Sequence, residues 1–124
     1  MNVVDSSGWL EFFADGPNAT FFAPSITDVE HLIVPVISIY EIFKRVLQQR
    51  SETDALQAIG QMAQGQVIDL SQTLALSAGK LSIDLKLPMA DSIILATARA
   101  YQAILWTQDA DFKHIDGVQY IEKQ

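Results

Sequence analysis

The sequence predicts an α/β protein in which helices cover both faces of a mostly parallel central sheet, a three-layer α/β/α domain spanning residues 1–124. Short apolar stretches suited to buried strands alternate with longer segments that have the 3.6-residue apolar period of helices. Strands separated by helices form βα units, which pair in parallel. A chain of 124 residues, 49% of them hydrophobic, is also long enough to bury the core of one globular domain.

The first part of the chain supplies two strands and two short helices. Asn2–Asp5 is predicted as a short buried strand, and Ser6-Ser7 as the caps of an amphipathic helix. Gly16-Pro17 is a typical helix end, and Ala19–Ser25 is predicted as a second short helix. The apolar run Leu32–Val34 is suited to a strand that is buried on both faces.

Two amphipathic helices are predicted next. The longer one, Val36–Gln49, follows Pro35, a residue favoured at the start of helices. Its predicted inner face comprises Val36, Ile39, Tyr40, Phe43, Val46 and Leu47. Ser51 to Asp54 predicts a capping box for the second helix, which Gly65 closes. The predicted inner stripe of this second helix is Leu56, Ile59 and Met62.

The remaining chain completes the alternation. A strand, two helices and two further strands are predicted, in this order, at Gln66–Leu70, Ser71–Asp84, Pro88–Tyr101, Ile104–Thr107 and Val118–Ile121. A polar turn at Gln108–Asp111 follows the fourth strand. In such sheets ligands bind beyond the carboxyl ends of the strands, so the residues there are the first candidates for a site.

Composition excludes several classes of function. The chain has no cysteine, and its two histidines, His31 and His114, lack paired spacing, which excludes thiolate zinc sites and cysteine nucleophiles. Glycine-rich phosphate loops and the Gly-x-Ser-x-Gly motif are absent. No apolar run reaches the length of a membrane span and no signal peptide is recognisable, so a cytoplasmic protein is expected. The net charge of −7 argues against nonspecific nucleic-acid binding.

Four carboxylates stand beside apolar segments, where an ionised group needs a partner or a cation. Asp5 and Asp109 follow predicted strands at the carboxyl edge of the sheet. Asp91 lies in the first turn of an apolar helix with no Lys or Arg within a turn on either side, and Glu41 lies inside the long helix. If these acids meet in space, they bind a hard cation such as Mg²⁺ or Mn²⁺, because all their ligand atoms are oxygen.

Each acid also has a structural interpretation that requires no ligand. Asp5 fits the N-cap position of the first helix, and Asp91 fits the favourable end of its helix dipole. Glu41 lies off the apolar stripe and has Arg45 four residues later as a surface ion-pair partner. The aspartates of the turn after the fourth strand belong to a residue type that commonly bonds its own backbone.

Taken in order, four segments resemble the acidic motifs of PIN-domain ribonucleases, and in particular the small VapC-type toxins of type II toxin-antitoxin pairs. The segments are Val3 to Ser7 around Asp5, Tyr40-Glu41, Leu87 to Ala96 around Asp91, and Trp106 to Phe112 around Asp109. The resemblance covers essentially the whole chain, in the family's order and spacing. One motif alone is weak, whereas the four together are specific.

The resemblance implies a PIN-like three-layer domain in which four acids hold one or two Mg²⁺ or Mn²⁺ ions: Asp5, Glu41, Asp91 and Asp109. The residues implied to shape or flank the pocket are Ser6, Thr107 and Asp111. The implied activity is hydrolysis of RNA phosphodiester bonds, with Lys44 and Arg45 as hypothetical contacts to the RNA backbone. The implied partners are an RNA substrate, a cognate antitoxin that inserts a segment into the groove, and a second copy in a homodimer.

Two other classes of protein remain open. A receiver-type signalling domain has a similar length and an acidic pocket, and its phosphoacceptor would be Asp69. It also needs a lysine after a late strand, and none follows Trp106 until Lys113. Alternatively, a PIN-like fold that only binds a protein partner would keep the acids for stability without cleaving RNA.

Overall fold

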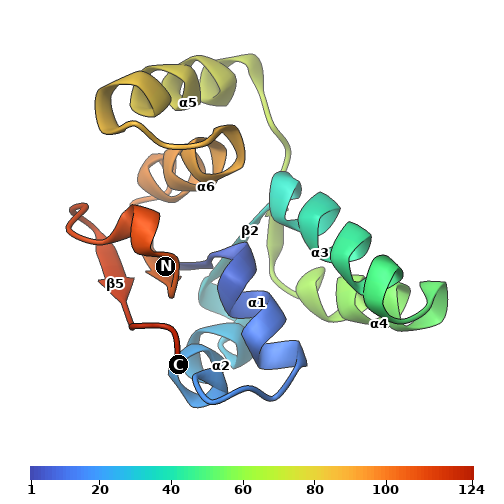
Figure 1. Ribbon diagram of the computed structural model, residues 1–124. Coiled ribbons are helices and arrows are strands. Elements are labelled where there is room, and N and C mark those ends of the chain that lie inside the picture. The colour runs from blue at the N-terminus through green and yellow to red at the C-terminus, as the bar shows by residue number, and fades with distance from the viewer.

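The computed structural model describes residues 1–124 and confirms the predicted α/β class (Figure 1). The strands are β1 (Asn2–Val4), β2 (Leu32–Pro35), β3 (Gln66–Ile68), β4 (Ile104–Thr107) and β5 (Val118–Tyr120). The helices are α1 (Ser6–Phe13), α2 (Ala19–Thr27), α3 (Val36–Gln49), α4 (Glu52–Met62), α5 (Gln72–Leu85) and α6 (Met89–Ala100), with 3₁₀ turns η1 (Val29–His31) and η2 (Ala110–Phe112). None of these helices combines the length and the apolar character that a bilayer-spanning helix requires.

All five strands pair in parallel, in the order β3-β2-β1-β4-β5. β1 is first in the chain but central in the sheet, where Val3 lies opposite Ile33 on one side and Leu105 on the other. The chain first builds outward from β1 to β3 and then crosses to the other side of β1 for β4 and β5. The strand order therefore reverses between β1 and β4, and ligands of open parallel sheets bind at the carboxyl ends of such a pair.

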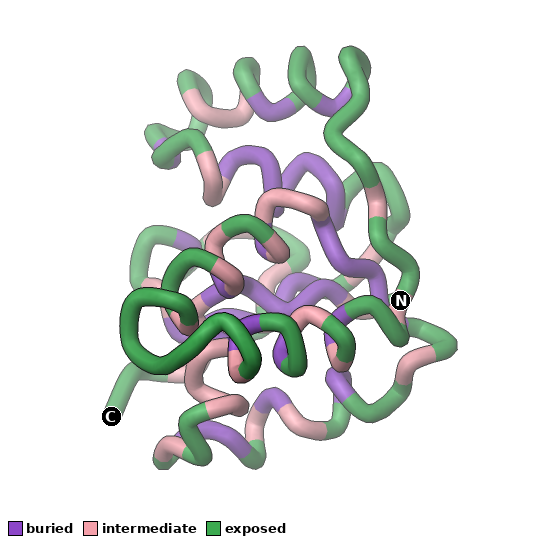
Figure 2. The backbone as a smooth tube through the Cα atoms, turned by 90° about the vertical axis from the view of Figure 1, so that its right-hand side faces the viewer, coloured by how far each residue is buried: buried purple, intermediate pink, exposed green.

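Side chains alternate between the two faces of the sheet and enter two separate apolar clusters. Val4 and Val34 belong to the first cluster, which α1, α2, α3 and α4 cover. Val3 and Ile33 belong to the second cluster, which α6 and η2 cover. Figure 1 shows α5 and α6 grouped on the opposite side of the molecule from α1 and α2, and in Figure 2 the buried segments run through its middle. The helices thus form the two outer layers.

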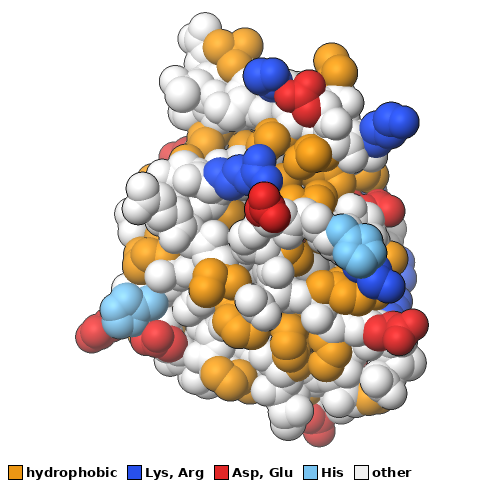
Figure 3. Space-filling view, turned by 90° about the vertical axis from the view of Figure 1, so that its left-hand side faces the viewer, with side chains coloured by type: hydrophobic (Ala, Val, Ile, Leu, Met, Phe, Trp, Pro, Cys, Tyr) orange, Lys and Arg blue, Asp and Glu red, His pale blue; other side chains and the backbone are white.

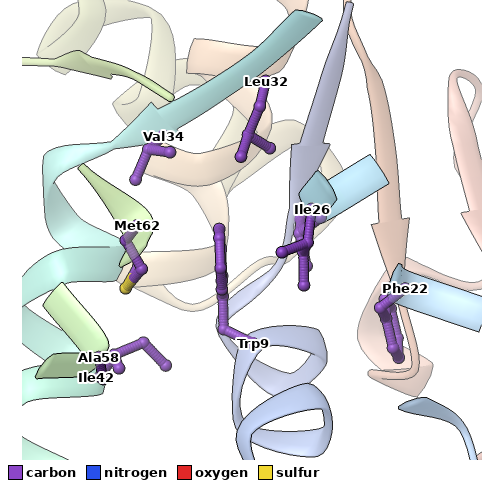
Figure 4. Packing of buried hydrophobic residues seen from close by; sticks show 9 residues of the cluster. Trp9, Phe22, Ile26, Leu32, Val34, Ile42, Ala58 and Met62 are labelled. Atoms are coloured by element: carbon purple, nitrogen blue, oxygen red, sulfur yellow. The ribbon is translucent and has the colours of Figure 1, made fainter. Parts of the chain in front are cut away.

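Trp9 is the largest side chain of the first cluster. It is 1% exposed, and its indole stands between Val34 and Met62 on one side and Ile26 on the other (Figure 4). The ring also stacks on Phe13 at a centroid distance of 5.7 Å. Truncating an aromatic side chain at such a position typically costs about 3–5 kcal/mol, so Trp9 is a main anchor of the short helix α1.

The buried faces of α3 and α4 differ from the predicted ones, although the bounds of α3 are as predicted. Ser38 and Ile42 of α3 are fully buried, whereas Tyr40 and Leu47, predicted to face inward, are 59% and 43% exposed. In α4, Leu56 is 57% exposed and the buried residues are Ala55, Ala58 and Met62. The prediction gave most weight to large apolar side chains, but the buried residues of the two helices also include the small Ser38, Ala55 and Ala58.

The predicted caps of α4 and α5 are confirmed. The hydroxyl oxygens of Ser51 and Ser71 accept hydrogen bonds from the backbone N–H groups of Asp54 and Leu74, each at 3.1 Å. No return bond from the Asp54 side chain completes the predicted capping box. Other bounds moved only slightly, since α2 continues past Ser25 to Thr27 and β3 stops at Ile68.

Substituting Gly8 on α1 tests how tightly this helix packs on the sheet. A Cβ at Gly8 would lie 2.6 Å from Cδ1 of Phe22 and 2.8 Å from Cγ1 of Val4, and both side chains are fully buried. Gly8→Ala is therefore expected to lower the free energy of unfolding by roughly 1–3 kcal/mol in urea denaturation.

The matched control is Gly60→Ala in the interior of α4, where an added Cβ meets no atom within 4 Å. Alanine is favoured over glycine in a helix interior by about 1 kcal/mol, so this variant is expected to be more stable than the wild type. A shift of stability in the same direction for both substitutions would contradict the tight packing around Gly8.

Candidate active site

The acids singled out in the sequence gather where β1 and β4 end side by side. Asp5 directly follows β1, and Thr107 ends β4 immediately before the turn that contains Asp109. The backbone N–H of Asp5 donates to the carbonyl of Trp106 at 2.9 Å, so the strand pairing continues up to Asp5 itself. Sheet pairing therefore fixes Asp5 beside the acidic turn.

Asp5 is only 2% exposed and has the N-cap position of α1, but its side chain makes no capping bond. Its Oδ2 instead accepts hydrogen bonds from the hydroxyls of Ser7 at 2.7 Å and Thr107 at 2.9 Å. The prediction that Ser6 and Ser7 cap α1 is wrong, because both lie inside the helix and donate to carboxylates. Burial raises the pKa of Asp5, the two hydrogen bonds oppose this rise, and the charge of Asp109 adds to it.

Thr107 links Asp5 to the turn that follows β4. Its hydroxyl donates to Asp5 and accepts from the backbone N–H of Asp109 at 2.9 Å. Oδ1 of Asp109 in turn accepts from the backbone N–H of Asp111 at 2.9 Å, as the turn interpretation of Asp109 predicts. A carboxylate has about four acceptor positions, so this bond leaves Asp109 free to accept or ligate elsewhere.

Three carboxylates lie close enough to share one cation. One oxygen each of Asp91, Asp109 and Asp111 lies within 4.8 Å of the others. Asp91 comes from the first turn of α6, and the other two come from the turn after β4. Both ion pairs of the molecule involve other residues, so no basic side chain neutralises these acids. A set of oxygen donors with uncompensated negative charge suits Mg²⁺ or Mn²⁺.

Glu41 approaches from α3. It is partly buried, and its Oε1 accepts a hydrogen bond at 2.7 Å from the hydroxyl of Ser6, the residue next to Asp5. The predicted ion pair between Glu41 and Arg45 is not formed. Periodicity alone indicated a solvated residue, whereas the structure turns Glu41 toward α1.

The pKa of Asp91 is raised both by burial and by the other acids. Burial raises its pKa to about 7, and four negative charges contribute to the same shift: those of Asp5, Asp109, Asp111 and Glu41. All five carboxylates therefore act as one electrostatic group, which we call the acid cluster (Asp5, Glu41, Asp91, Asp109 and Asp111). Their use as ligands of a metal stays a prediction.

The hypothetical RNA contacts lie on the same helix as Glu41. Lys44 and Arg45 are exposed and line a surface depression together with Tyr40, Glu41 and Gln48. The ammonium group of Lys44 stands 5.7 Å from the ring centroid of Tyr40. A different face of the molecule, shown in Figure 3, carries cations and acids scattered among apolar side chains, without a continuous basic surface.

Sequence reasoning missed several polar residues that support this region. Ser7 was assigned only as a cap, and neither Asn18 nor Gln108 was singled out. Asn18 Nδ2 donates to Oε1 of Gln108 at 2.9 Å and to the carbonyl of Glu122 at 3.0 Å, and both Asn18 and Gln108 are buried. These bonds hold the acidic turn and the C-terminal segment together. Asp109 was selected because it follows the carboxyl end of a strand, and its neighbour Gln108 has the same position. Nothing in the sequence indicates a supporting role for Asn18.

The model of the PIN domain family matches residues 3–118 of the chain. The chain belongs to the PIN domain family. The matched range contains the whole acid cluster, all of β4, and Val3 and Val4 of β1. Membership confirms the resemblance that the four acidic segments indicated. A search of curated proteins finds no match to this PIN-domain sequence.

Solved structures share the PIN fold along nearly their whole length. A toxin-antitoxin complex from Klebsiella pneumoniae contains a chain with 23% identity and a TM-score of 0.81, with 96% of each chain covered. VapBC2 from Rickettsia felis, bound to a DNA fragment from the promoter, gives 16% identity and a TM-score of 0.74 over 98% of this chain and 97% of that one. VapC20 from Mycobacterium tuberculosis, a sarcin-ricin loop cleaving toxin, gives 13% identity and a TM-score of 0.76 over 94% and 95%. At these identities the likeness shows the fold.

In the metal-free protein, the raised pKa of Asp91 predicts a loss of stability as pH increases. Between about pH 4 and the folded-state pKa of about 7, Asp91 is ionised in the unfolded chain but still protonated in the folded one. The folded state then binds more protons, so the free energy of unfolding falls over this window.

In EDTA, the wild-type thermal midpoint is expected to fall between pH 5 and pH 8. Asp91→Asn should flatten this slope and raise the midpoint at pH 8, because the repulsion is removed. A wild-type midpoint that does not change with pH would contradict the shift.

Proposed function

We propose that this PIN domain is a Mg²⁺- or Mn²⁺-dependent endoribonuclease and the toxin of a type II toxin-antitoxin pair. One observation carries the proposal: five carboxylates share one electrostatic site at the carboxyl ends of β1 and β4, and no basic side chain is paired with them. Repulsion of this kind destabilises a fold unless the site serves a cation. The family and its toxin relatives supply the chemistry that fits such a site.

The donor set fits a hard divalent cation. Oxygens of Asp91, Asp109 and Asp111 lie within 4.8 Å of one another, and the buried Asp5 and the partly buried Glu41 adjoin them. When bound, such an ion neutralises the acids, lowers the pKa of a bound water and offsets the charge that develops on the phosphate. In this proposal the principal ligands are Asp5, Asp91 and Asp109, directly or through water.

The other residues hold these ligands in place. The hydroxyls of Ser7 and Thr107 fix the Asp5 carboxylate, and the Thr107 hydroxyl also anchors the backbone of Asp109. Ser6 fixes Glu41, which we assign as a ligand or as the group that orients the attacking water. Asp111 is a further ligand at the exposed side of the cluster. Metal binding requires ionised carboxylates, so it competes with the protonation of Asp91.

Cations beside the cluster supply the contacts to RNA. Lys44 and Arg45 line the same depression as Glu41, so they can hold backbone phosphates next to the acids. The net charge of −7 makes long-range attraction to RNA weak. Binding therefore depends on the bound metal and on a few local contacts, which favours a structured target over arbitrary RNA.

An antitoxin is the proposed protein partner. A groove of about 250 Å³ lies between α1, α3 and α4 and is lined by apolar residues such as Leu10, Phe13 and Val46 together with Arg50. Such a groove suits an inserted apolar segment of a partner chain. We propose that the protein acts in the cytoplasm, where RNA and antitoxin are present, and that it forms a homodimer.

The two alternative functions make different predictions. A noncatalytic PIN module could bind Mg²⁺ but would leave a panel of tRNA and rRNA fragments uncut. A receiver-type domain would be labelled at Asp69 by a small acyl phosphate, and Asp69 is exposed after β3, apart from the acid cluster. Family membership and the acid cluster both favour the nuclease.

Asp5→Asn or Asp91→Asn is expected to abolish Mg²⁺-dependent cleavage of tRNA and rRNA fragments while the circular dichroism spectrum stays that of the wild type. An amide keeps the size of the side chain and its acceptor oxygen but removes the negative charge that binds the metal. Asp69→Asn is the matched control and should cleave like the wild type. Undiminished cleavage by the purified Asp5→Asn/Asp91→Asn double variant would overturn the assignment.

Lys44→Ala and Arg45→Ala are expected to raise KM for RNA and leave kcat nearly unchanged, because the two cations bind the backbone without taking part in bond cleavage. Each substitution should also reduce the slope of log KM against log salt by about 1. Lys80→Ala on α5, which removes an exposed cation paired with Asp84, is the control and should change neither quantity. A fall in kcat at constant KM would rule out a pure backbone-binding role.

A further inference from the structure

Ser38 of α3 has an unusual environment for a hydroxyl group. The residue is 0% exposed, and its Oγ is the single buried side-chain N or O atom of the molecule without a hydrogen-bond partner. Buried hydroxyls are nearly always bonded, and an unbonded one destabilises the fold. Other buried helix hydroxyls follow this rule, since Ser92 donates to the carbonyl of Met89 and Thr97 to that of Ile93.

The position of Ser38 within α3 explains why the usual partner is missing. It lies in the first turn of the helix, which begins at Val36. The residue four positions earlier, Val34, belongs to β2, so its carbonyl is not part of the helix. The hydroxyl also makes no bond to the carbonyl three positions earlier, that of Pro35, so the backbone of its own helix leaves it without a partner.

The packing of α3 places Ser38 at the same sheet edge as the acid cluster. Ile37 packs on the apolar cluster beneath α6, whereas Ile42 belongs to the cluster on the other face of the sheet. Ser38 lies between these two residues in the chain and is itself fully buried. Strand register pairs Val3 with Ile33, so Asp5, two residues on, is level with Pro35 at the start of α3.

Ser38 also shares its helix with Glu41, a member of the acid cluster. It precedes Glu41 by three residues, and residues at this spacing share a helix face. Glu41 is bonded to Ser6, the neighbour of Asp5. Ser38 therefore shares a helix face with one carboxylate of the acid cluster, that of Glu41.

We propose that Ser38 is a positioning residue whose hydroxyl donates to a carboxylate of the acid cluster when the divalent cation is bound. The inference rests on the proposed function. Its physical basis is that an unsatisfied donor destabilises the metal-free protein, whereas a partner gained on binding adds to metal affinity. Hydrogen bonds from neighbouring groups to metal ligands fix the orientation of those ligands.

The test compares the metal-free stability of Ser38→Ala with its Mn²⁺ affinity, measured by isothermal titration calorimetry. The thermal midpoint in EDTA is expected to stay equal to that of the wild type or to rise, because an unsatisfied hydroxyl has been removed. The Kd for Mn²⁺ is expected to increase roughly tenfold. Ser38→Thr keeps the hydroxyl and should keep the wild-type Kd even if its extra methyl group lowers the midpoint.

Thr97→Val is the matched control, since it deletes a buried helix hydroxyl that already has a partner. It should show the opposite pattern, a lower midpoint with an unchanged Kd for Mn²⁺. A lower midpoint and an unchanged Kd for Ser38→Ala would overturn the role of Ser38 alone. A wild-type protein that binds no Mn²⁺ would overturn the proposed function, and the role of Ser38 with it.

Discussion

The structure depends on burying a carboxylate where two parallel strands end side by side. Register pairs Val4 of β1 with Trp106 of β4. The residues that follow them are Asp5 and Thr107, and the hydroxyl of Thr107 donates a hydrogen bond to the carboxylate of Asp5. The same threonine holds the backbone of Asp109, so one contact aligns two separate parts of the acid cluster. Strand pairing thus assembles charges that repel one another. The core provides the free energy that holds them, and a bound cation would relieve the repulsion.

The features that sequence reasoning anticipated depend on residue type and on the rules of parallel sheets. Alternating strands and helices fixed the fold class, and the carboxyl-edge rule selected Asp5 and Asp109 before any contact was known. Asp91 was recognisable because an acid in an apolar helix without a nearby cation needs an explanation. Its pKa is raised by burial and by the other acids, so the ionised form of Asp91 is destabilised in the metal-free protein.

The features that sequence reasoning missed depend on which side of a helix meets its neighbours. A pattern of apolar residues selects Tyr40 for the inner face of α3 and passes over Ser38. In the structure the serine is buried and the tyrosine is exposed. Glu41 was placed by family resemblance alone, because its hydrogen bond to Ser6 joins residues that are far apart in the chain. Local patterns give little weight to small residues, although these residues permit the closest packing between elements.

The central place of β1 has a consequence for the order in which the protein is made. β1 is made before the other four strands, but its partner β4 and the acids of α6 and the following turn come only after β2, β3 and α3 to α5. Domains fold as units once their pairing segments are available. An unfinished chain therefore has no complete acid cluster. In a protein proposed to cut RNA, the proposed metal ligands therefore cannot assemble until α6 and the turn after β4 have been made.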